Sequence, residues 1–197
     1  MRKLLILTGL VASSALLVAC SNDDGRNAVD QTQDKVAEGV GQVSASAWGS
    51  NNPETYAMSA SMGDMYEIRS ADLALQHSSN DKVKELARMI KADHTAASEQ
   101  LKTAVGSAGV RVATANELDE RRKGMLDNLA GADKAGFDKA YLEQQVAAHE
   151  EALTLHRGFT ENTDAPELRE HARTVIPKIE AHLKTARELL ANVQSTN

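Results

Sequence analysis

Residues 81–101 read DKVKELARMIKADHTAASEQL, and this stretch predicts an α-helix with one apolar face. Its apolar residues recur three and four positions apart, which is the spacing of neighbours on one side of a helix. They are Val83, Leu86, Ala87, Ile90, Ala97 and Leu101. His94 falls on the same side, so we expect its imidazole to face the protein interior. The stretch therefore predicts a packed helix that carries a buried histidine.

Helices are expected through most of the chain after residue 52. They cover about residues 53–77, 82–105, 116–129, 137–159 and 164–193. Asn52 is a suitable N-cap for the first helix, with Pro53 at its first position. Asp164 followed by Glu167 resembles a capping box, and Pro177 should kink the last helix. Two tight hairpins joined by a longer connection with a short helix predict an all-α, ferritin-like four-helix bundle.

Two other expected helices carry an inward histidine in the same way. His149 and His182 each continue the apolar stripe of their own helix. With a rise of about 1.5 Å per residue, both imidazoles and that of His94 lie near the middle of the bundle. Glu67, on the first helix, reaches a similar level between small residues. We therefore expect four side chains from four helices to lie at one level of the interior.

Three imidazoles and one carboxylate would form a mononuclear metal site suited to Zn, Cu, Ni or Fe. The alternative is that these are core histidines, which hydrogen-bond to one another, to Glu67 or to the backbone and fix the helix register. A di-iron site is not expected, because it needs Glu-x-x-His on two helices. Lys91, Val146 and Ile179 stand three residues before the histidines instead. The sequence shows no pairing of a nucleophile with a base that would indicate an enzyme.

Other candidate ligands have structural interpretations. His156 lies two helical turns after His149, roughly 10 Å away, so it should not share an ion with it. His77 and His171 are expected at the periphery. A methionine stripe on the first helix fits core packing better than a copper site, because methionine fills irregular helix interfaces. Residues 121–123, Arg-Arg-Lys, are expected on a solvent-exposed helix face.

Four short motifs resemble those of a bacterial envelope family labelled domain of unknown function 4142. They are ADHT at 92–95, FDKAY at 137–141, AHE at 148–150 and IPKIEAHL at 176–183. The resemblance extends from about Thr55 to Val193. It implies a bundle similar in outline to ferritin-like proteins, and it implies no reaction.

The N-terminus has the pattern of an exported lipoprotein. Arg2 and Lys3 precede a short apolar run, and Leu-Val-Ala-Cys at 17–20 resembles the lipobox, in which Cys20 is fatty-acylated. An ordinary secretory signal with a chance cysteine is the alternative. By resemblance to Gram-negative sorting, Ser21 favours the outer membrane. We therefore expect a lipid-anchored protein on the periplasmic face of that membrane.

The expected organisation is a signal peptide at 1–19, a lipidated cysteine and tether at 20–52, and the helical domain at 53–197. Loss of the signal peptide removes two basic and no acidic residues, so the net charge changes from -6 to -8 and nucleic acid is excluded as a partner. The tethered bundle is expected to bind an envelope protein or cell-wall partner without catalysis. The alternative is a metal-binding bundle for storage or sensing.

Overall fold

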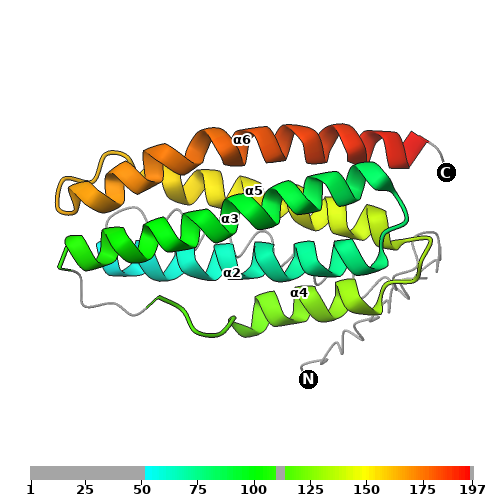
Figure 1. Ribbon diagram of the computed structural model, residues 1–197, viewed down its shortest axis with the longest axis horizontal. Helices are drawn as coiled ribbons and strands as arrows, with labels where there is room; N and C mark the ends of the chain where they lie inside the picture. Colours follow the sequence, from blue (N-terminus) through cyan, green and yellow to red (C-terminus); the bar gives the residue numbers. More distant parts are fainter. Residues whose placement is uncertain (1–51, 110–113, 196–197) are drawn as a thin grey trace, which may run out of the picture.

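The computed structural model describes residues 52–109 and 114–195, and these residues form five helices and no strand (Figure 1). The helices are α2 (Pro53–His77), α3 (Asp81–Ser107), α4 (Glu120–Gly131), α5 (Phe137–Phe159) and α6 (Pro166–Ser195). The predicted all-α class is confirmed. The signal peptide, Cys20 and nearly all of the expected tether lie outside the described residues.

Four long helices surround the core, each packed against two others. Helix α2 contacts α3 and α5, and α6 contacts the same two helices from the opposite side. Helix α4 lies along the outside of α2 and α5. Figure 1 shows that α4 carries the chain back along the molecule, so that α5 begins near the end where α3 began. Neighbouring long helices therefore all run antiparallel.

The helix starts follow local side-chain chemistry. The side chain of Asn52 accepts a hydrogen bond from the Thr55 amide at 2.8 Å, which confirms the predicted cap of α2. Asp119 caps α4 in the same way, so this helix begins at Glu120, four residues later than expected. At α6 the capping-box prediction is wrong: the Asn162 side chain accepts from the amide of Asp164, and the helix begins at Pro166. Helix α6 continues past Pro177 to Ser195.

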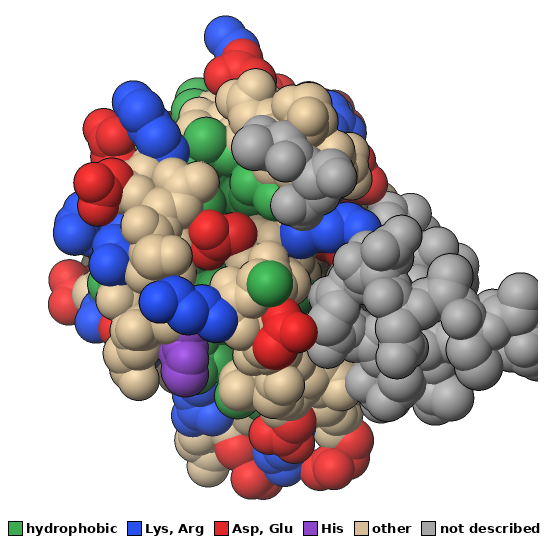
Figure 2. Space-filling model, turned by 90° about the vertical axis from the view of Figure 1, so that its right-hand side faces the viewer, with side chains coloured by type: hydrophobic (Ala, Val, Ile, Leu, Met, Phe, Trp, Pro, Cys, Tyr) green, Lys and Arg blue, Asp and Glu red, His purple; other side chains and the backbone are tan. Residues whose placement is uncertain are grey.

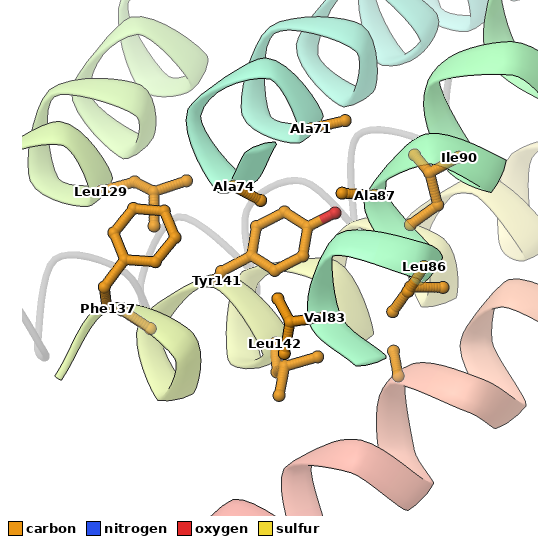
Figure 3. Close-up of a cluster of buried hydrophobic side chains, with 12 residues drawn as sticks. Ala71, Ala74, Val83, Leu86, Ala87, Ile90, Leu129, Phe137, Tyr141 and Leu142 are labelled. Carbon is orange, nitrogen blue, oxygen red and sulfur yellow. The ribbon is translucent and has the colours of Figure 1, made fainter. Parts of the chain in front are cut away.

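Two apolar clusters occupy the two ends of the helix group. At one end the Tyr141 and Phe137 rings pack among small and aliphatic residues of α2, α3 and α4 (Figure 3). At the other end Tyr56 stacks on Phe159, with ring centroids 3.9 Å apart. Alanines such as Ala71 let the helices approach closely. Buried polar residues are concentrated on the stretches of α2, α3, α5 and α6 between these clusters, and they form the candidate site.

The outer surface is mixed in charge. Figure 2 shows acidic and basic side chains interspersed over one end of the molecule, with small apolar patches between them. Among the described helices, none combines the length and apolar character needed to cross a membrane.

Candidate metal centre

Three histidines from three helices meet in the middle of the core. One ring nitrogen from each of His94, His149 and His182 lies within 4.8 Å of the other two. All three side chains are buried, with 6%, 1% and 1% of their surfaces exposed. The helix periodicity had predicted inward histidines at one level, and this prediction is confirmed. Their role as metal ligands remains a prediction.

The His94 ring is held by a carboxylate. Its Nδ1 lies 2.8 Å from Oδ1 of Asp64, whose other oxygen accepts a hydrogen bond from the Ser98 hydroxyl. A carboxylate accepts hydrogen bonds, so Nδ1 is the protonated nitrogen and Nε2 of the neutral ring carries a lone pair. That Nε2 is buried and has no hydrogen-bond partner among the described residues.

The tautomers of the other two rings also follow from the acceptors that their nitrogens meet. Nδ1 of His149 lies 2.8 Å from the Gln145 carbonyl oxygen, which can only accept, so Nε2 of His149 carries the lone pair. Nε2 of His182 lies 2.9 Å from Oδ2 of Asp93, so the lone pair of His182 is on Nδ1. Three imidazoles, each oriented by a carboxylate or a backbone carbonyl, is the usual arrangement around a protein-bound metal.

Lowered pKa values keep two of these rings available as ligands. Burial, with the nearby His94 and His182, holds the pKa of His149 well below its ordinary value. Burial and His94 lower the pKa of His182 as well, against the opposing hydrogen bond to Asp93. Burial lowers the pKa of His94 as well, but the hydrogen bond to Asp64 and the nearby carboxylates together outweigh burial, so the net shift is upward. Two of the three rings are therefore neutral at pH 7, the form that binds metals.

Glu67 lies beside this group rather than within it. Its Oε1 is 3.7 Å from Nδ1 of His149, the nitrogen that faces away from the shared centre. Burial raises the pKa of Glu67 to about 7, with His94 and Gln145 opposing. Neither carboxyl oxygen meets a hydrogen-bond partner among the described residues. Its predicted role as a fourth ligand stays a prediction.

A second group of buried polar side chains adjoins the first. The Tyr56 hydroxyl lies 2.9 Å from Nδ1 of both His156 and His171. Nε2 of His171 lies 3.2 Å from the Ala97 carbonyl oxygen, so the Tyr56 hydroxyl can donate to His171 and accept from His156. The prediction that His171 is peripheral was wrong, because only 5% of it is exposed. His77 is exposed, as expected.

The expected solvent-exposed face at 121–123 is also corrected. Arg121 and Arg122 both bind Glu151 of α5, at 2.9 Å and 2.6 Å, and the Arg122 side chain is only 12% exposed. The Lys123 side chain is 41% exposed and pairs with Glu120. Periodicity could not show this, because the acidic partner lies on another helix. Met62 and Met65 pack against an apolar cluster that includes Met125, as the core-packing interpretation predicted.

Comparisons with known proteins give a family and a fold. The family model described as domain of unknown function (DUF4142) matches residues 38–189. Two similar solved structures are CopM in the Cu(I)-bound form (23% identity, TM-score 0.61, 72% of this chain and 96% of that one) and CopM in the Cu(II)-bound form (24%, 0.61, 71% and 96%). A third is the DUF305 fragment from Deinococcus radiodurans (12%, 0.58, 81% and 95%). No curated protein matches significantly.

Proposed function

The chain belongs to the DUF4142 family, whose description names no reaction, and from its histidine centre we propose that it binds a single transition-metal ion. The ligands are Nε2 of His94, Nε2 of His149 and Nδ1 of His182. The observation that carries the proposal is that one nitrogen of each ring lies within 4.8 Å of the other two, while Nδ1 of His94, Nδ1 of His149 and Nε2 of His182 are hydrogen-bonded elsewhere. An imidazole set of this kind suits Zn, Cu, Ni or Fe.

The spacing of the nitrogens supports this assignment. In a tetrahedral centre with metal–nitrogen bonds of about 2.0–2.1 Å, two ligand nitrogens are roughly 3.3 Å apart. Nε2 of His149 and Nδ1 of His182 are separated by 3.3 Å. This pair already has the spacing of tetrahedral ligands, and a nitrogen of His94 within 4.8 Å of both completes the set.

Copper is the ion that we propose to test first. The CopM structures are described as bound to Cu(I) and Cu(II), and they share the fold of this chain. Storage or sensing is the role that we propose for the bound ion. The connectivity of the long helices, with one crossover occupied by α4, further supports a ferritin-like bundle.

We also propose that the protein is anchored by lipid on Cys20 to the periplasmic face of the outer membrane, where it could present its helical domain to an envelope or cell-wall partner. The sequence pattern of residues 1–21 supports this location. Replacement of Cys20 by Ala should move the protein from the membrane fraction to the soluble fraction. Retention of the Cys20→Ala variant in the membrane fraction after a high-salt wash would contradict the lipid anchor. Recovery of the wild-type protein in the inner membrane would contradict the outer-membrane location.

The test of metal binding is a titration of the tag-free, demetallated protein with Zn, Cu, Ni and Fe while the melting temperature is recorded. Binding to the folded state alone raises the melting temperature, and the size of the rise follows the affinity. We expect the largest rise with copper. If no metal changes the melting temperature and the native protein is metal-free, the three histidines are core residues and a tethered interaction domain is the better interpretation.

A further inference from the structure

A small cavity borders the histidine centre. It has a volume of about 40 Å³ and lies between α2, α4 and α5. Its lining includes Gly63, Glu67, His94, His149, Arg122 and Ala152. A buried water needs roughly 10–15 Å³ of such a cavity, so this one has room for a molecule of a few atoms. Two of the three proposed metal ligands thus have an open space beside them.

Glu67 shows that this space is suited to a polar molecule. The side chain is 3% exposed and lines the cavity, yet neither of its oxygens has a hydrogen-bond partner among the described residues. A buried carboxyl group without partners is costly, and a hydrogen-bonding molecule in the cavity would supply one. Arg122, which also lines the cavity, is already paired with Asp119 and Glu151.

Three imidazoles leave a four-coordinate ion with one free position, which in proteins is taken by water or a substrate. We propose that this free position opens on the cavity and takes a small monodentate ligand, such as water or a small anion. The inference rests on the proposed metal site and adds to it that the centre is open rather than closed. Glu67 would accept a hydrogen bond from a ligand that carries a proton.

Gly63 offers a matched pair of variants. A Cβ atom at this position meets nothing within 4 Å, so Gly63→Ala should be tolerated and leave most of the cavity free. Gly63→Leu places three further carbons in the same direction and should fill the space. Ala152→Leu approaches from α5 and provides a second filling variant. Neither position carries a proposed metal ligand.

The experiment loads the purified protein and its variants with Cu(II), measures the bound copper, and titrates azide while the visible and EPR spectra are recorded. We expect an azide-to-copper charge-transfer band in the wild type and in Gly63→Ala. In Gly63→Leu and Ala152→Leu the azide affinity should fall at least tenfold, with the copper content unchanged.

The outcomes separate the two proposals. Absence of bound copper would overturn the copper site, and the open position with it. Bound copper whose spectra azide leaves unchanged would overturn the open position alone. If one filling variant does not fold, as judged by its melting temperature, the other decides the result. Wild-type azide affinity in a folded filling variant would place the ligand elsewhere and refute the inference.

Discussion

Nε2 of His149 lies 3.3 Å from Nδ1 of His182, and neither nitrogen carries a proton when both rings are neutral. The proton of His149 is on Nδ1, where it meets the Gln145 carbonyl, and that of His182 is on Nε2, where it meets Asp93. Without a proton between them, these two nitrogens cannot hydrogen-bond to each other, but both can bind a cation. A ring nitrogen of His94 lies within 4.8 Å of both, so the three histidines offer three ligand atoms to one ion.

Replacing His94 by Leu should abolish most of the metal-induced rise in melting temperature. Leu removes one of three ligand nitrogens, and the remaining two hold an ion weakly. The matched control is His77→Leu, because His77 is an exposed histidine on α2 that lies outside the cluster. Differential scanning fluorimetry with and without copper measures both. Equal rises in the two variants would refute the three-histidine centre.

Asp64→Asn should weaken metal binding by roughly 10–100-fold, the usual cost of losing a carboxylate that orients a metal-binding histidine. The carboxylate of Asp64 fixes the tautomer of His94 from a buried position. Asp72→Asn is the control, since Asp72 lies on the same helix but pairs with Lys91 at the surface. Competition titrations against a chelator give the two affinities. An unchanged affinity in Asp64→Asn would show that the negative charge of Asp64 has no part in binding.

Periodicity predicted the helices and the level of the three histidines because both depend on local spacing. The apolar stripe around His94 fixes the direction of its ring, whatever the partner helix. Helix α5 begins and ends at the predicted residues, Phe137 and Phe159, because its apolar face spans its whole length.

Partners between helices could not be predicted in this way. Asp64 and Asp93 were missed, although a buried imidazole that binds metal needs a hydrogen-bond acceptor on its other nitrogen. Asp93 precedes His94 in the sequence and yet binds His182 of α6. The burial of His171 likewise depends on Tyr56, which is 115 residues away. Such pairs follow from the packing of α2, α3, α5 and α6, which no single stripe specifies.

Tyr56→Phe should destabilise the protein by roughly 1–3 kcal/mol, the cost of leaving a buried polar group without its partner. The hydroxyl is the shared hydrogen-bond partner of His156 and His171. Copper affinity should change far less than in Asp64→Asn, because the Tyr56 hydroxyl contacts His156 and His171 and none of the three proposed ligands. Urea unfolding of the metal-free protein and a copper titration provide the two measurements. A large loss of affinity with unchanged stability would mean that the two histidine groups act as one site.

The last prediction concerns Glu67, whose pKa in the folded protein is raised from 4.5 to about 7 by burial. A carboxyl group with a raised pKa binds its proton more tightly in the folded state than in the unfolded state. The folded protein therefore loses stability as the pH rises and this proton dissociates. In the metal-free wild type this loss should begin near pH 4.5 and be complete above about pH 7. The Gln side chain in Glu67→Gln does not titrate, so this variant should not lose stability in this way. It should become more stable than the wild type as the pH rises, by roughly 3 kcal/mol at most. Other titrating groups are common to both proteins, and their contributions largely cancel in the difference. Urea unfolding of both proteins at several pH values between 4 and 8 tests the prediction, and a difference that does not change with pH would show that folding does not raise the pKa of Glu67.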